Sequence, residues 1–192
     1  MRVRKALSSV KSCPRTAVFI SGGGSTLQAL LEMNEFFKTA LVISNRKRAL
    51  GAVKAKRFGV PTFFMDKQMD FEQLHALLLQ NKIDQIFLAG FMKILPEVFI
   101  QKWQRRIFNI HPSLLPHYKG LEAFERAYAD KAECGVTIHH VVAEMDAGEK
   151  ILQQKISPEA KNYSYSDAAL LLRRTEQNLL RTFALRKAQN YV

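Results

Sequence analysis

The sequence predicts an α/β fold, in which a mostly parallel sheet carries helices on both faces and the chain ends in a β-hairpin and a long C-terminal helix. Short β-branched and aromatic segments alternate with helical patterns from residue 16 to residue 110. Such alternation is typical of parallel strands joined by right-handed crossovers. After Gly135 the rhythm changes to two strand-like segments separated by a loop longer than a tight turn. The predicted arrangement is Rossmann-like.

The individual elements follow from local patterns. Strands of the parallel region are expected at Thr16–Ile20, 40–44, 62–65, 86–89 and 106–110. Helices are expected from Leu27 onward, at 49–58, at Phe71–Gln80 and at 96–103. In the third of these, Leu74, Leu77 and Leu78 recur at helical spacing and should face the core. The hairpin strands are expected at 136–142 and 151–156, and the closing helix at 167–186.

Composition favours a globular protein with a basic surface. Apolar residues make up 47% of the 192, and the mean hydropathy is −0.13. The net charge of +12 is compatible with nucleic acid, a membrane surface or small anionic substrates. However, the basic residues are not interleaved with aromatic ones, and no apolar run approaches the roughly 20 residues of a membrane helix. We therefore interpret most of the basic residues as a solvated surface that also attracts anions, such as small anionic substrates, and expect neither nucleic acid nor a membrane as partner.

The chain is expected to form a single domain over residues 15–192, because no repeat, low-complexity tract or linker interrupts them. Residues 1–14 are basic and carry no acid, so a disordered tail is expected there, with an organellar presequence as the alternative. The two cysteines have neither metal-ligand nor disulfide spacing, which favours a reducing compartment. We expect a cytoplasmic monomer or homodimer.

The segment 108–116, F-N-I-H-P-S-L-L-P, has the strongest chemical pattern. Asn109 and His111 are two residues apart, so they project from the same face of an extended strand. Pro112 and Pro116 end that strand at the edge where open α/β sheets bind ligands. Histidine can donate a proton to a developing oxyanion, and an Asn amide adds a neutral donor. The alternative is a polar turn in which Asn caps and His packs.

Two other loops are expected at the same edge. The turn after the first strand, S-G-G-G-S-T at 21–26, has the layout of an anion site, although a triple glycine is often only a tight turn. The apolar segment 91–96, after the fourth strand, is expected to form either a pocket wall or the start of a helix. Asp146, in the hairpin loop, could reach His111 and would raise its pKa, keeping the imidazole protonated.

Four motifs appear in an order and at separations that resemble a known family. They are S-G-G-G-S-T-L-Q (21–28), A-G-F-M-K-I-L (89–95), F-N-I-H-P-S-L-L-P (108–116) and M-D-A-G-E-K-I-L-Q (145–153). Over 16–183 the sequence resembles phosphoribosylglycinamide formyltransferases, which belong to the folate-dependent formyltransferase superfamily.

The resemblance implies specific roles for residues of this chain. The implied catalytic residues are Asn109, His111 and Asp146. The implied substrate-binding residues are Gly23, Gly24, Ser25 and Thr26 for the ribotide phosphate and Glu176 for the sugar hydroxyls. The implied folate-binding residues are Met92, Lys93, Ile94, Leu95 and Asn109, with Thr137 and His139 on the strand beside the folate pocket. For Glu176 the alternative is a solvated residue on a polar helix face.

The sequence departs from the family pattern in two places. The family has Asn where this chain has Thr26, which offers a hydroxyl but no amide donor. The family also usually has a basic residue before the helix at Phe71–Gln80 to contact the cofactor. Here the aligned position is near Asp70 and Phe71, with Lys67 as a candidate replacement.

The resemblance implies direct transfer of a formyl group from 10-formyltetrahydrofolate to the amine of glycinamide ribonucleotide in de novo purine biosynthesis. His111 would act as the general acid, and no metal would be needed. The alternatives are a different amine acceptor, such as an amino sugar nucleotide or aminoacyl-tRNA, and a formyl-folate hydrolase. A basic, non-catalytic nucleic-acid binder would leave the Asn–His–Asp set unexplained.

Overall fold

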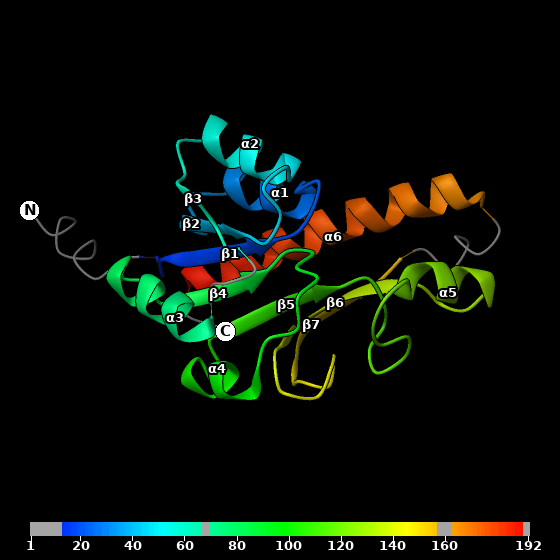
Figure 1. Cartoon of the computed structure of the whole chain (residues 1–192). Helices are drawn as coiled ribbons and strands as arrows, with labels where there is room; N and C mark the ends of the chain where they lie inside the picture. Colours follow the sequence, from blue (N-terminus) through cyan, green and yellow to red (C-terminus); the bar gives the residue numbers. More distant parts are fainter. Residues whose placement is uncertain (1–12, 67–69, 157–162, 190–192) are drawn as a thin grey trace, which may run out of the picture.

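The computed structural model describes residues 13–66, 70–156 and 163–189. The described strands form one seven-stranded sheet in the order β3-β2-β1-β4-β5-β6-β7 (Figure 1). They are β1 (Thr16–Ile20), β2 (Thr39–Ser44), β3 (Thr62–Phe64), β4 (Gln85–Leu88), β5 (Ile107–His111), β6 (Gly135–His140) and β7 (Lys150–Lys155). The first five strands pair in parallel, and β6 and β7 extend the sheet as an antiparallel hairpin. The predicted fold class is confirmed.

The helices also match the predicted order, with one addition. They are α1 (Ser25–Glu32), α2 (Leu50–Arg57), α3 (Phe71–Gln80), α4 (Glu97–Lys102), α5 (Ala123–Ala129) and α6 (Tyr165–Ala188). The bounds of α3 agree with the prediction, and Asp70 caps this helix by accepting a hydrogen bond from the backbone N–H of Gln73. No helix was predicted at α5.

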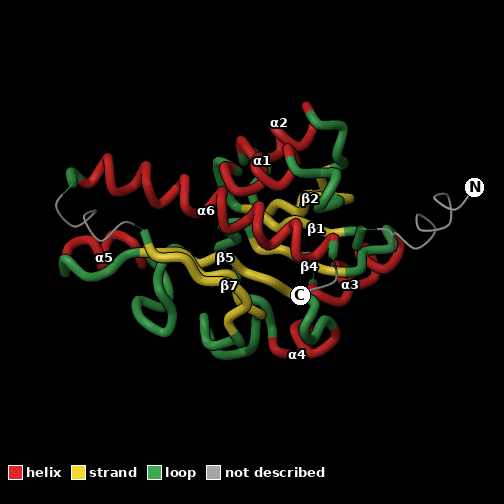
Figure 2. Tube along the Cα trace, turned by 180° about the vertical axis from the view of Figure 1, so that it is seen from behind, coloured by secondary structure: helices red, strands yellow, loops and turns green. Residues whose placement is uncertain are grey.

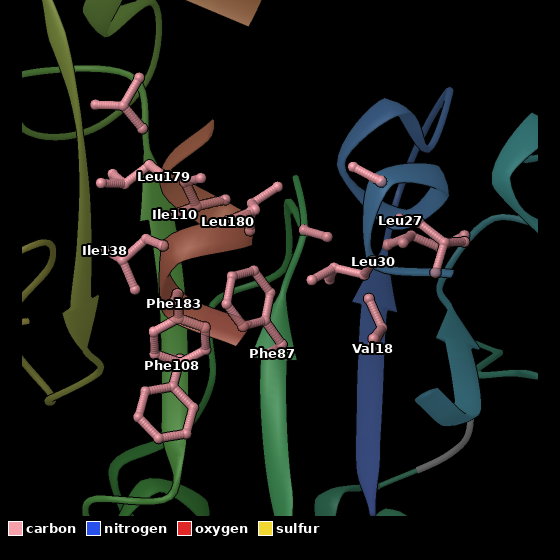
Figure 3. Packing of buried hydrophobic residues seen from close by; sticks show 14 of the residues in the cluster. Val18, Leu27, Leu30, Phe87, Phe108, Ile110, Ile138, Leu179, Leu180 and Phe183 are labelled. Carbon is pink, nitrogen blue, oxygen red and sulfur yellow. The ribbon is translucent and has the colours of Figure 1, made fainter. Parts of the chain in front are cut away.

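Helices cover both faces of the sheet, as Figures 1 and 2 show from opposite sides. The side chains of β1 alternate between the two cores: Val18 packs with residues of α1 and α6, and Phe19 with residues of α3 and α4. In the α6 core, the ring centroid of Phe183 lies 5.7 Å from that of Phe87 and 5.2 Å from that of Phe108 (Figure 3). Burying each such ring contributes roughly 1.5–3 kcal/mol to folding, so α6 holds the central strands in place.

The parallel register brings three loops to one edge of the sheet. β1 pairs with β4, and β4 pairs with β5, so the segments that begin at Ser21 and Ala89 leave the sheet beside the end of β5. This is the carboxyl edge, where open α/β sheets bind ligands. Residues 1–12, most of the predicted basic tail, lie outside the described residues, as does Lys67.

Candidate active site

Asn109 and His111 project from one face of β5, as predicted from their spacing. Ile107, two residues before Asn109, packs in the core under α3 and α4, so the two polar side chains lie on that side of the sheet. In the antiparallel register, Asn109 pairs with His139 of β6, and His111 pairs with Thr137. The side chain of His111 is 7% exposed and that of His139 is 2% exposed. Four polar side chains therefore meet at one end of β5 and β6.

The loop between β6 and β7 returns Asp146 to this group. Asp146 has a positive φ of 50°, a conformation that Asp tolerates better than most residues. Its Oδ2 accepts a hydrogen bond from the backbone N–H of Gly120 at 2.9 Å. Gly148 lies so close to β6 that a Cβ there would be 1.7 Å from the carbonyl oxygen of His140. The loop is thus fixed against the sheet, and Asp146 is not free in solvent.

The amide nitrogen of Asn109 has two acceptors within the site. Nδ2 lies 3.2 Å from Nε2 of His139 and 3.4 Å from Oδ1 of Asp146. Nδ1 of His139 lies 2.8 Å from the carbonyl oxygen of His140, and a carbonyl can only accept. In the neutral ring, Nδ1 therefore carries the proton and Nε2 accepts from Asn109. This contact was not predicted from the sequence. It depends on the register of β5 and β6, which places Asn109 opposite His139.

His111 lies between a carbonyl and a carboxylate. Its Nε2 donates to the carbonyl oxygen of Tyr118 at 2.9 Å, and its Nδ1 lies 3.4 Å from Oδ2 of Asp146. Burial lowers the pKa of His111 and outweighs Tyr118 and Asp146, which both raise it. The expectation of a raised pKa was therefore wrong in sign. The predicted carboxylate is present, but desolvation of the ring is the larger effect.

Asp146 is ionised over the whole physiological pH range. Burial alone would raise its pKa, but the His139 side chain 3.5 Å away, the hydrogen bond from the N–H of Gly120 and the charge of His111 together lower it from 3.8 to about 2. A fixed negative charge therefore faces Nδ1 of His111. That charge stabilises an imidazolium whenever the ring gains a proton at Nδ1.

The glycine turn lies against α2 and α6. Gly24, the N-cap of α1, has a φ of 67°, and a Cβ there would be 2.6 Å from Cα of Gly51. The turn therefore requires glycine at this position. The hydroxyl of Thr26 donates a hydrogen bond to Oε1 of Glu176 in α6. Burial raises the pKa of Glu176, and this outweighs the hydrogen bond from Thr26. Glu176 is thus a half-buried partner of the turn rather than a solvated side chain.

The segment after β4 divides into exposed and covered side chains. Met92 is 62% exposed and Ile94 is 75% exposed, whereas Leu95 is buried in the core with 6% exposure. The amino group of Lys93 lies 5.2 Å from the ring centroid of Phe71. The N–H of Met92 donates to Oγ of Ser21 at 2.8 Å, so this segment is joined directly to the glycine turn.

The described residues contain neither a metal site nor a membrane-spanning helix. Within 13–66, 70–156 and 163–189, no group of three or more His, Cys, Asp or Glu side chains is arranged to hold a metal ion. None of the helices described is long and apolar enough to cross a membrane.

Comparison with known proteins identifies the family. The model of the formyl transferase family matches residues 14–182. The chain belongs to the formyl transferase family. This family member is 40% identical over 154 residues to the phosphoribosylglycinamide formyltransferase of Haemophilus influenzae, a match that covers 74% of the chain and 72% of that enzyme.

Two further relatives of this formyl transferase family member agree with that assignment. The trifunctional purine biosynthetic protein adenosine-3 of Homo sapiens is 41% identical over 157 residues. The match covers 76% of the chain, but the chain spans only 16% of the length of that relative. The crystal structure of phosphoribosylglycinamide formyltransferase from Anaplasma phagocytophilum superimposes with a TM-score of 0.80 at 37% identity, covering 89% of this chain and 87% of the other.

Proposed function

We propose that the chain transfers the formyl group of 10-formyltetrahydrofolate to the primary amine of glycinamide ribonucleotide, a step of de novo purine biosynthesis. The observation that carries the proposal is the placement of Nδ1 of His111, which lies 3.4 Å from the Asp146 carboxylate at the carboxyl edge of the sheet. The glycine turn and the apolar segment after β4 leave the same edge. Membership of the formyl transferase family and the named relatives support the same reaction.

His111 is proposed to move the proton that the reaction must relocate. When the amine adds to the formyl carbon, the amine nitrogen must lose a proton and the folate nitrogen that leaves must gain one. Nε2 of His111 keeps its proton on the Tyr118 carbonyl, so Nδ1 is the atom that gains and releases the proton. The lowered pKa makes the imidazolium a stronger acid, and the ionised Asp146 stabilises it while it exists.

Asn109 is proposed to stabilise the oxyanion that develops on the formyl oxygen. Its amide nitrogen carries two N–H groups: one is held by Nε2 of His139 at 3.2 Å, and the other, whose contact with Oδ1 of Asp146 is longer at 3.4 Å, would turn to the formyl oxygen. The contact with His139 keeps the amide in place during that exchange, and a neutral donor then stabilises the developing charge. His139 therefore acts here as a positioning residue.

The two substrates are proposed to bind to the two loops beside this trio. The ribotide phosphate would take hydrogen bonds from the backbone of Gly23, Gly24, Ser25 and Thr26, where α1 begins. Glu176, held by Thr26, would accept hydrogen bonds from the sugar hydroxyls. The exposed side chains of Met92 and Ile94 offer apolar surface to the folate rings, with the Lys93 and Leu95 backbone completing the segment.

The remaining features of the proposal concern the whole protein. Residues 15–192 act as one formyltransferase domain, as a monomer or homodimer in the cytoplasm, on small molecules rather than on nucleic acid or a membrane. The reaction uses no metal.

A panel of acceptors tests the proposal. Purified protein is mixed with 10-formyltetrahydrofolate and one acceptor at a time, and the deformylated folate is followed by absorbance. We expect turnover with glycinamide ribonucleotide and none with an amino sugar nucleotide or aminoacyl-tRNA. Turnover with another acceptor alone would replace the substrate assignment, and equal turnover with no acceptor would identify a hydrolase.

A further inference from the structure

A groove lies on the outer side of α2, at the β3 edge of the sheet, and we call it the α2 groove. It is lined by residues 47–49, by one face of α2 and by residues 59–62 and Phe64, and its volume is about 770 Å³. Val53 and Phe64 bring apolar surface to it and are 51% and 39% exposed. Ligand sites typically enclose roughly 300–1,000 Å³ and are lined mainly by apolar side chains. The groove therefore has the size and the lining of a small-molecule site.

The α2 groove is separate from the proposed active site. In the sheet, β2, β1 and β4 lie between β3 and β5, which carries Asn109 and His111 (Figure 1). The groove is lined by residues that recur at helical spacing along one side of α2, namely Ala49, Ala52, Val53 and Lys56. Gly51, on the opposite side of the helix, is the residue that contacts the glycine turn. A ligand in the groove would thus touch neither the catalytic trio nor the turn.

The charges around the groove select an anion. Lys47, Arg48 and Lys56 are lining residues, and no acidic residue is found among the lining side chains of the described chain. None of the three forms an ion pair within the part of the chain that the structure describes. Three like charges around one cavity repel each other, and a multiply charged anion relieves that repulsion. A second copy of this chain would bring more positive charge, because its net charge is +12.

We propose that the α2 groove binds a nucleotide. The base would lie against the half-exposed Phe64 ring, and the phosphates would meet Lys47, Arg48 and Lys56. Arg48 can bind phosphate oxygens with two parallel N–H groups, and the two lysines add point charges. A singly charged amphiphile would leave two of the three cations unmatched. An extended acidic peptide is disfavoured because β3, at the edge, has only three residues with which to pair.

Calorimetric measurement of ADP binding tests the proposal. Glycinamide ribonucleotide is present in excess, so that it fills any phosphate site at the glycine turn. ADP should bind, and Lys56→Glu should lower the affinity for ADP by about tenfold or more, since a charge-assisted contact is replaced by repulsion. Arg57→Glu is the matched control: it makes the same charge change at the next position of α2, outside the lining residues. It should alter affinity by no more than about twofold, the scale of a screened surface charge.

Two further measurements identify the base and the location. Phe64→Leu should weaken ADP several-fold but leave pyrophosphate binding unchanged, because only the base contacts the ring. Formyl transfer by Lys56→Glu should equal that of the unmodified chain. Absence of ADP binding, equal losses in Lys56→Glu and Arg57→Glu, equal affinity for ADP and pyrophosphate, or displacement of ADP by the ribotide would each overturn the proposal. The comparison of Lys56→Glu with Arg57→Glu and the effect of Phe64→Leu do not depend on which formyl acceptor the chain uses.

Discussion

Replacing Asp146 by Asn removes the charge that faces His111 while keeping the shape of the side chain. In the structure, Oδ1 of Asp146 accepts from Asn109 and Oδ2 accepts from the N–H of Gly120. An Asn side chain retains one of these acceptors and turns a donor toward the other. A pKa lowered from 3.8 to about 2 corresponds to about 2 kcal/mol of stabilisation at neutral pH. We therefore expect Asp146→Asn to lower the free energy of unfolding by about 2 kcal/mol.

The same substitution should slow turnover by about a hundredfold or more, the usual scale for losing general acid–base catalysis. The affinities for both substrates should change little, because Asp146 contacts His111, Asn109 and the Gly120 backbone rather than either proposed binding loop. Since the Asp146 charge raises the pKa of His111, removing it should lower that pKa further below the ordinary value of 6.5. The assays are steady-state formyl transfer and NMR titration of the imidazole.

Glu144→Gln provides the matched control. Glu144 lies in the same loop, loses the same charge on substitution and pairs with Lys119 at the surface. It should leave both turnover and the His111 titration unchanged. If Asp146→Asn behaved like this control in both assays, Asp146 would have no part in the proposed proton transfer.

Four further predictions concern the glycine turn and pH. At Gly23 an added Cβ meets no protein atom within 4 Å, so in binding assays Gly23→Ala should lower the affinity for the ribotide, whose phosphate is proposed to bind there, but not the affinity for the folate. Gly24→Ala should destabilise the whole protein by about 1–3 kcal/mol in denaturant unfolding, because of its positive φ and its close backbone neighbour. Thr26→Val should remove the hydrogen bond to Glu176 and raise KM for the ribotide about tenfold with kcat nearly unchanged. Thr26→Ser keeps the hydroxyl and should leave KM near that of the unmodified chain. Between pH 4 and 2 the free energy of unfolding of the unmodified chain should fall by about 2 kcal/mol more than that of Asp146→Asn, because the Asp146 carboxylate becomes protonated. Equal dependence of unfolding on pH in the two proteins would contradict this.

The periodic parts of the fold were predictable from sequence because their patterns are local. Alternating strands and helices, with proline at 112 and 116, place Asn109 and His111 at the end of β5 without knowledge of any tertiary contact. The helix α5 was missed for the same reason. It has only seven residues, begins after Glu122 with no side-chain cap, and is held by Phe124 and Ala127 in the core. Tertiary packing rather than local signal stabilises such a helix.

The chemistry of the site was less predictable from sequence, because the protonation of its residues depends on the balance between burial and neighbouring charges. The sequence indicated that Asp146 approaches His111, but the sign of the pKa shift depends on how deeply the ring is buried. The tight fit of Gly148 against β6 depends on the three-dimensional course of the hairpin loop. The contact of His139 with Asn109 needs the register of β5 and β6, which residue types alone do not define. Likewise, the burial of Leu95 separates it from its exposed neighbours in the same motif.

The central claim is that the formyl group passes from folate to the ribotide amine at the Asn109–His111–Asp146 site. The most direct test supplies 10-formyltetrahydrofolate labelled with carbon-13 in the formyl group, together with glycinamide ribonucleotide, and locates the label by NMR and mass spectrometry. We predict that the label appears on the glycinamide nitrogen, and that His111→Ala abolishes its transfer. Label recovered only as formate, with the ribotide unmodified, would contradict the claim.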